Sequence, residues 1–185
     1  IAVCGTLGWW QWTRAHDQAV TVQQEPEVAL VEVIEPAMPA GAAIGRQVTV
    51  QGRWLEADAA VVRGREVDGV PAAFLVRPFV VDASQTGTGE EATLAVLVGW
   101  APEDDVVVAP PPVSPATVAG YLRASEASQP GAGGTAVDNA VVTGSVSVAT
   151  FAQEWPAPMY SAVLASDAGE PGWDPLPARE PPTRL

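Results

Sequence analysis

The chain has 185 residues, enough for one compact domain, and hydrophobic residues make up 48% of it. Its formal net charge is −13 and all nine basic residues are arginine, so no lysine-rich surface is available to neutralise the phosphates of a nucleic acid. Cys4 is the only cysteine, which excludes an intramolecular disulfide and a zinc site built from several thiolates.

The first residues form an apolar run, IAVCGTLGWWQW, that carries no charge. The run is shorter than the about 20 residues that a membrane-spanning helix needs, and we interpret residues 1–13 as the end of a truncated membrane helix. Its tryptophans would lie at the membrane boundary, with Arg14 just beyond them. The helix is predicted to continue into water and to end at Pro26. A buried terminal helix of a soluble domain is the alternative.

Valine-rich segments bounded by Gly, Pro or Asp follow at short intervals and predict strands. These segments are residues 28–34, 46–54, 59–67, 72–81 and 93–101. In the second of them, valines alternate with Thr49 and Gln51, which is the pattern of a half-buried strand. Residues 94–98, LAVLV, show no alternation and predict a strand covered on both faces. The polar residues 82–93 predict an exposed hairpin loop.

The proline-rich residues 109–115 predict an extended connector between the halves of the sheet. Strand character returns afterwards, a short helix is predicted around SVATFAQEW, and the chain from Gly169 onward is Pro-rich and predicted to be structurally weak. The strand-like segments of this second half are residues 117–125, 140–148 and 158–166.

These elements predict an α+β fold that is mainly β. We expect a single compact antiparallel sheet or a partly open barrel, preceded by an N-terminal helix that is the end of a membrane span. The expected organisation is a membrane-helix end over residues 1–13, an extracytoplasmic β-rich domain over 14–168, and a Pro-rich segment over 169–185 that leads to a missing second transmembrane helix.

The residue types that nucleophilic or metal-dependent catalysis needs are scarce. His16 is the only imidazole, and the sequence has no HExxH or CxxC spacing and no phosphate-binding glycine loop. The acidic runs at residues 90–91 and 103–105 stand in turn-like polar segments, where runs of charge usually form a solvated face. We therefore predict that the protein is not an enzyme, with no catalytic residue and no metal site.

The segment LGWWQWTR resembles the LGxWQxxR signature at the end of the first membrane helix of the Surfeit locus protein 1 family. Similar segments follow in the family's order: VTVQGRW, FLVRPF, VLVGWAP and VAGYLRASEASQP. The resemblance covers roughly residues 5–130. VLVGWAP lacks the Asn-Arg pair that the family has before its Gly-Trp, so no function of that arginine carries over. The residues that match the first signature are Leu7, Gly8, Trp10, Gln11 and Arg14.

The resemblance implies a bacterial assembly factor for haem-copper cytochrome c oxidase, which aids the delivery or insertion of haem a into subunit I. Family members have two membrane helices flanking one domain outside the cytoplasm. The expected location is therefore the plasma membrane, and the expected partners are subunit I or the respiratory complex, and the membrane. In some bacterial members a histidine in the second membrane helix is associated with haem binding. That helix would follow Leu185, so the haem a ligand is expected outside this chain.

A membrane-edge motif of Trp10, Gln11 and Arg14 is the candidate cofactor-binding site. In it, the glutamine would hydrogen-bond to the second helix, and the arginine would pair with a haem propionate or a carboxylate of the client protein. The acidic domain offers strand edges and the regions of Trp54 and Trp100 as candidate contacts with the oxidase. Packing in the core is the alternative for both tryptophans.

Two other functions stay open. A secreted or membrane-tethered β-rich binding module would recognise its ligand through exposed Trp and Tyr faces. An accessory subunit of a respiratory complex would keep the fold without handling haem.

Overall fold

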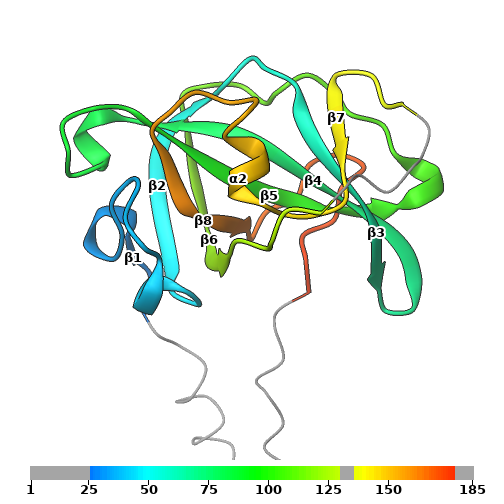
Figure 1. The fold of residues 1–185 in the computed structure, drawn as a ribbon, viewed down its shortest axis with the longest axis horizontal. Coiled ribbons are helices and arrows are strands. Elements are labelled where there is room, and N and C mark those ends of the chain that lie inside the picture. Colours follow the sequence, from blue (N-terminus) through cyan, green and yellow to red (C-terminus); the bar gives the residue numbers. More distant parts are fainter. Residues whose placement is uncertain (1–25, 130–135, 178–185) are drawn as a thin grey trace, which may run out of the picture.

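β-Strands dominate the computed structural model, which describes residues 26–129 and 136–177 (Figure 1). Eight strands form one continuous sheet, and the helical elements are short. The strands are β1 (Val28–Ala29), β2 (Gln47–Trp54), β3 (Ala59–Val67), β4 (Val70–Val81), β5 (Ala92–Pro102), β6 (Ala116–Ala124), β7 (Ala140–Thr143) and β8 (Met159–Ser166). The helical elements are η1 (Leu30–Glu32), η2 (Gly41–Ala43), η3 (Ala83–Gln85), η4 (Glu103–Asp105) and α2 (Val148–Phe151).

Five of the strands close into a barrel, in the order β2, β6, β8, β5 and β4. The closure is an antiparallel pairing in which Gly52 on β2 stands opposite Val81 on β4. A Cβ added to Gly52 would lie 2.1 Å from the carbonyl oxygen of Val80, so the two backbones can approach this closely only because the residue is glycine. The barrel is therefore closed and not partly open as predicted.

The sheet is also mixed, and the prediction of an antiparallel sheet is wrong in part. β1 pairs in parallel with β2, β7 with β3, and β8 with β5, while the other neighbours are antiparallel. Parallel neighbours cannot be joined by a tight turn. Each parallel pair therefore brings together segments that are distant in sequence, which strand periodicity alone does not reveal.

Most of the predicted strands are confirmed with small shifts at their ends, as β2 to β6 and β8. Residues 28–34 are an exception: only Val28–Ala29 pair as a strand, and the chain then turns through η1, which buries Leu30. The carboxylate of Glu32 accepts a hydrogen bond from the Ala29 N–H at 3.2 Å and supports this turn. The strand predicted for residues 140–148 ends at Thr143, and α2 begins at Val148 inside the predicted helix.

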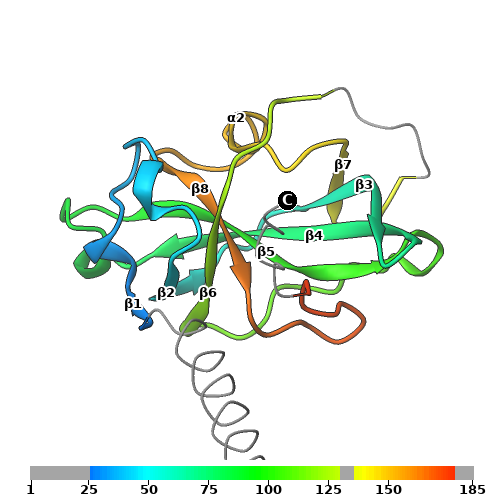
Figure 2. The same ribbon diagram turned by 90° about the horizontal axis from the view of Figure 1, so that it is seen from below.

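The core has two apolar clusters, and β5 contributes to both. Leu94 and Val96 belong to the larger cluster, whereas Ala95 and Leu97 belong to the smaller one with Phe151. The helix α2 covers this second cluster on one side of the barrel (Figure 1, Figure 2). The prediction that LAVLV is covered on both faces is confirmed.

The last described residues contradict the prediction of weak structure from Gly169 onward. Through residue 177 this segment packs on the barrel: Trp173 is 2% exposed, and Asp174 forms an antiparallel bridge with Trp100. The indole Nε1 of Trp173 donates a hydrogen bond of 3.1 Å to the carbonyl oxygen of Val107. Residues 169–177 therefore pack as part of the domain.

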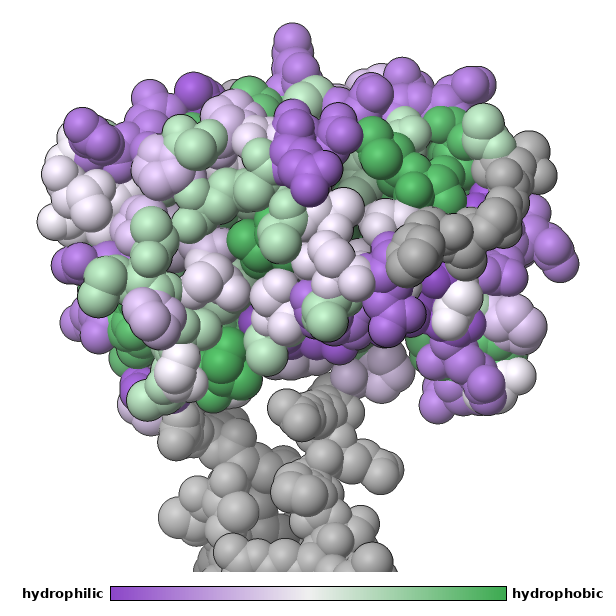
Figure 3. Space-filling view, viewed as in Figure 1, coloured by the Kyte–Doolittle hydropathy of each residue, from purple (hydrophilic) through white to green (hydrophobic). Residues whose placement is uncertain are grey.

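The described chain begins and ends on the same side of the barrel, at its blue and red ends in Figure 1. On the face drawn in Figure 3, hydrophilic side chains surround smaller groups of hydrophobic ones, as the net charge of −13 leads one to expect. No helix among the residues that the structure describes has the length and apolarity to span a bilayer. The predicted membrane-helix end over residues 1–13 lies outside the described residues.

Candidate functional site

A cleft of about 590 Å³ opens where the described chain ends, and Leu176 and Pro177 form part of its wall. The remaining wall comes from the β3–β4 hairpin, the last residues of β6 and the residue that follows η2. Because these elements are far apart in sequence, only the closed barrel brings them together. We call this hollow the hairpin cleft.

One part of the hairpin cleft is apolar. Tyr121 from β6, Ile44 and Leu176 provide partly exposed apolar surface, whereas Phe74 from β4 is 7% exposed and belongs mainly to the smaller core cluster. Phe74 is held in place from outside the cleft, because the guanidinium of Arg65 lies 5.5 Å from the centre of its ring. Such a surface suits the apolar part of a small ligand.

The polar part of the hairpin cleft contains one cation and two acids. The guanidinium of Arg123 makes no hydrogen bond and no ion pair with the part of the chain that the structure describes. Glu66 and Asp68 are exposed at the β3–β4 turn. The cleft therefore combines apolar walls with an arginine whose donors are available to a carboxylate or phosphate group.

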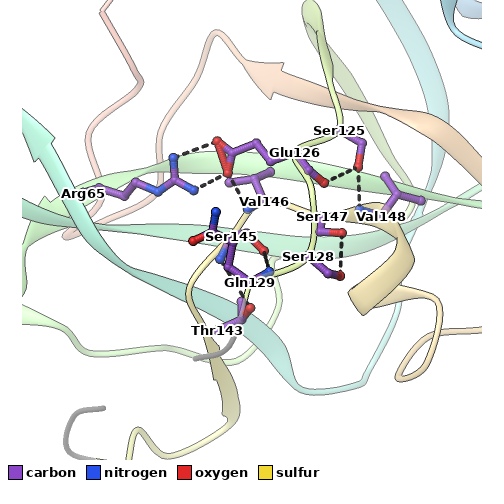
Figure 4. A network of polar contacts seen from close by, with 10 residues as sticks. All are labelled: Arg65, Ser125, Glu126, Ser128, Gln129, Thr143, Ser145, Val146, Ser147 and Val148. Carbon is purple, nitrogen blue, oxygen red and sulfur yellow. Dashed lines mark hydrogen bonds and ion pairs between the residues drawn. The ribbon is translucent and has the colours of Figure 1, made fainter. Parts of the chain in front are cut away.

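Beside the cleft, Glu126 holds the neighbouring charges in place (Figure 4). Arg65 donates hydrogen bonds to both of its carboxylate oxygens, one of them at 2.7 Å, and the Val146 N–H donates a third at 2.8 Å. The hydrogen bond from Arg65 holds the pKa of Glu126 below its ordinary value; the Val146 N–H and the charges of Arg65 and Arg123 act in the same direction, while burial opposes them. Arg65 thus pairs with Glu126, while Arg123 lies near enough to influence that carboxylate but pairs with neither it nor any other described acid.

The same network joins residues 125–129 to residues 143–148 (Figure 4). The Val148 N–H donates to the Ser125 hydroxyl at 2.9 Å, and the Gln129 N–H donates to the Ser145 hydroxyl at 3.2 Å. The described residues contain no histidine to activate any of these serines. The network is therefore a support for the loop that carries Glu126 and for the end of β6.

The predicted site residues divide between described and undescribed parts of the chain. Trp10, Gln11 and Arg14 lie outside the described residues, as do Cys4 and His16. In the described ranges no group of three or more His, Cys, Asp or Glu is placed to hold a metal ion.

The two candidate contact tryptophans are partly buried. Trp54 packs edge-on against Phe79, with ring centres 5.0 Å apart, and Trp100 packs on the smaller core cluster. The acidic runs lie on the surface, where the exposed Glu91 pairs with Arg53 at 2.9 Å and Glu103 accepts a hydrogen bond from the Gly64 N–H at 2.9 Å. Packing and solvation therefore account for most of these residues.

Sequence reasoning did not find a buried ion pair that fixes the C-terminal segment. Arg77 is 2% exposed on β4 and donates to both carboxylate oxygens of Glu170, at 2.7 and 2.9 Å, and to the carbonyl oxygen of Ala109 at 2.8 Å. An arginine inside the apolar run FLVRPF was the available signal, because a buried charge needs a partner. The partner could not be named, since it is distant in sequence.

Gly99, the glycine of VLVGWAP, also helps to fix the C-terminal segment on the barrel. A Cβ added to Gly99 would lie 2.3 Å from the carbonyl oxygen of Asp174, so the bridge between β5 and the C-terminal segment requires glycine at this position. The GWAP sequence is therefore explained by packing of this segment, without any ligand.

The described residues define a small closed β-barrel with an open amphipathic cleft, and they contain no recognisable catalytic constellation. The sequence model of the SURF1 family matches residues 1–184. This chain belongs to the SURF1 family, which is the Surfeit locus protein 1 family that the sequence motifs resemble. The family is associated with cytochrome oxidase assembly and is generally non-enzymatic. No curated protein and no solved structure matches the chain.

Proposed function

We propose that this protein aids the delivery of haem a to cytochrome c oxidase, or its insertion into subunit I. Family membership supports a role in oxidase assembly, and the observation that carries the proposal is the position of the hairpin cleft beside the C-terminal end of the described chain. In a domain tethered to a membrane at both ends, the side where both ends lie faces that membrane (Figure 1). The cleft would then open toward the site of insertion.

The residues of the hairpin cleft suit part of a haem. Tyr121, Ile44 and Leu176 offer partly exposed apolar surface to a flat ring, and Arg123 has donors for a propionate. The described residues include neither a histidine nor a cysteine to bind the haem iron. We therefore assign the cleft to the carboxylate edge of haem a and expect the iron ligand elsewhere.

The proposal places the domain on the extracytoplasmic side of the plasma membrane. The absence of lysine and the small number of arginines agree with this side, because Lys and Arg beside a membrane helix favour the cytoplasmic side. In this proposal Trp10, Gln11 and Arg14 would lie at the membrane edge, as the sequence motif implies.

The proposal is tested by deleting the protein and recording the haem a absorbance of the membranes. We expect a loss of haem a that the natural chain restores. Arg123→Gln should restore it poorly, whereas Glu91→Gln should restore it fully, because Glu91 lies half-exposed in a surface ion pair and lines neither the hairpin cleft nor the hollow beside Trp54. Normal oxidase absorbance without the protein would refute the proposal.

Deletion and co-purification together separate the two other functions from this one. An accessory subunit would co-purify with mature oxidase in stoichiometric amount, and the haem a content of the membranes would be normal without it. An unrelated binding module would leave both the oxidase and its haem a unchanged. Replacing Trp10 or Arg14 tests the membrane-edge motif separately, because full haem a content in those variants would count against its role.

A further inference from the structure

Residues 106–115 connect η4 to β6 and expose two large apolar side chains. Val113 is 89% exposed and Val107 is 75% exposed, the two highest values for large hydrophobic side chains among the described residues. The segment also contains three consecutive prolines, Pro110, Pro111 and Pro112. We call residues 106–115 the proline ridge. The two valines line different hollows, one toward each end of the segment, and together with the prolines between them they give the segment an apolar surface suited to contact with a partner protein.

The barrel holds the proline ridge at several points. The carbonyl oxygen of Val107 accepts from the Trp173 indole at 3.1 Å, and that of Ala109 accepts from Arg77 at 2.8 Å. The side chain of Val108 is buried in the larger core cluster. Near the other end, the Ser114 hydroxyl accepts a hydrogen bond of 2.8 Å from the Trp54 N–H.

These contacts have a consequence for binding. A free proline-rich linker would lose conformational entropy when a partner ordered it, whereas the proline ridge is already fixed at both ends. Its exposed valines are therefore presented by a preorganised backbone. A hollow of about 510 Å³ lies along it, between Trp54 and Leu55 on one side and residues 111–114 on the other.

The chemistry of the proline ridge selects the kind of partner. Pro110, Pro111 and Pro112 have no N–H, so this stretch cannot add to the edge of another sheet as a strand. Extended proline-rich segments are recognised by grooves lined with aromatic side chains. Glu103, Asp104 and Asp105 precede the ridge directly, and the last two are exposed, so basic groups on the partner would complement them.

We propose that the proline ridge docks into a groove of a partner protein that is lined with aromatic side chains and has Lys or Arg at its rim. The partner is a part of cytochrome c oxidase that projects outside the cytoplasm, and this identification rests on the proposed function. The surface differs from the hairpin cleft, because the two share no lining residue. One surface would hold the client while the other handles the cofactor.

The test measures binding of purified, detergent-solubilised oxidase to the immobilised full chain. The double variant Val107→Asp, Val113→Asp should weaken binding at least about tenfold, equal to about 1.4 kcal/mol. Asp104→Asn with Asp105→Asn should slow association and reduce its dependence on salt. Val31→Asp is the matched control, since Val31 is also exposed, at 37%, but lies on η1. Its affinity should stay within about twofold.

Each variant is first checked for an unchanged unfolding midpoint, so that a loss of binding cannot come from misfolding. Unchanged affinity of the folded double variant would overturn the proposal. It would equally be overturned if the same valines were needed for self-association of the chain, or for binding to phosphatidylglycerol vesicles, and not for binding the oxidase.

The proline ridge and the proposed function can fail separately. If deletion lowers haem a but the double variant binds oxidase normally, the proposed docking by the proline ridge is wrong and the assembly role stands. If the double variant loses oxidase binding while deletion leaves haem a normal, the docking surface stands and the haem role fails.

Discussion

Arg77 and Glu170 form a two-point ion pair between residues 93 positions apart in the sequence, with donor–acceptor distances of 2.7 and 2.9 Å. The side chains are 3% and 10% exposed. Because Arg77 also donates to the carbonyl oxygen of Ala109, one guanidinium joins β4, the proline ridge and the C-terminal segment. The pair therefore fixes the segment that forms one wall of the hairpin cleft.

We expect Glu170→Gln to lower the free energy of unfolding by about 3–5 kcal/mol, because it leaves a buried guanidinium without its counter-charge. Urea unfolding followed by tryptophan fluorescence would measure the loss. Glu91→Gln is the matched control: its pair with Arg53 is about half exposed on both sides, and its loss should stay below about 1 kcal/mol. Equal losses in the two variants would contradict a structural role for the buried pair.

Glu126 should make stability depend on pH. Its pKa is lowered in the folded protein, chiefly by the hydrogen bond from Arg65, so the folded state favours the ionised form more than the unfolded state does. This contribution is fully present above the ordinary glutamate pKa of 4.5 and is lost as the pH falls through the lowered value. Glu126→Gln should therefore reduce stability at pH 7 and make the decline below pH 4.5 shallower. Urea unfolding at a series of pH values would show this.

A control for this pH dependence is Glu154→Gln, which changes an exposed glutamate beside α2. An acid decline that is the same in Glu126→Gln and in the natural chain would count against the interpretation.

Gly99→Ala should displace the C-terminal segment from β5. The new Cβ would lie 2.3 Å from the carbonyl oxygen of Asp174, and overpacking of this kind costs about 1–3 kcal/mol. Limited proteolysis should then cut within residues 167–177 faster than in the natural chain. Since Glu170→Gln loosens the same segment, the stability losses of the two changes should be less than additive in the double variant. Strict additivity would indicate that the two contacts act independently.

Tyr160→Phe tests a buried hydroxyl. Tyr160 is 0% exposed, and its hydroxyl has no hydrogen-bond partner among the described residues. Burial raises the pKa of the Tyr160 phenol, and the charge of Glu35 adds to the effect. Removing the hydroxyl should leave the free energy of unfolding unchanged or raise it by up to about 1 kcal/mol. Tyr121→Phe at the hairpin cleft is the control, and a clear loss in Tyr160→Phe alone would mean that the hydroxyl is satisfied by a bound water.

Local pattern was a good guide to the individual strands. The alternation of Val48 and Val50 with Thr49 and Gln51 predicts one buried face, and β2 has it. Side chains of a strand alternate because of the backbone itself, so a few residues suffice to show the pattern. The same locality explains the failure at residues 28–34, where a valine-rich run turns into η1 after two paired residues.

The candidate sites, in contrast to the strands, could not be predicted from local sequence pattern. The prolines, the acidic run and the valines of the ridge are visible in the sequence, but the contacts of Trp173, Arg77 and Trp54 that fix them are not. The hairpin cleft is assembled from residues between Ile44 and Pro177, and no spacing in the sequence connects Arg123 with Phe74. Trp10, Gln11 and Arg14 keep their place as a prediction, since they lie outside the described residues.

The sequence by itself determined the mainly β class, the family and the shortage of catalytic side chains. Strand periodicity, motif order and residue counts are properties of the sequence that do not depend on which distant segments come into contact. Only the tertiary structure decided that the barrel closes at Gly52, that β8 runs parallel to β5, and that Glu170 neutralises Arg77. These features depend on which distant segments bury one another's apolar and charged groups. Which segments pack together depends on the folding of the whole chain.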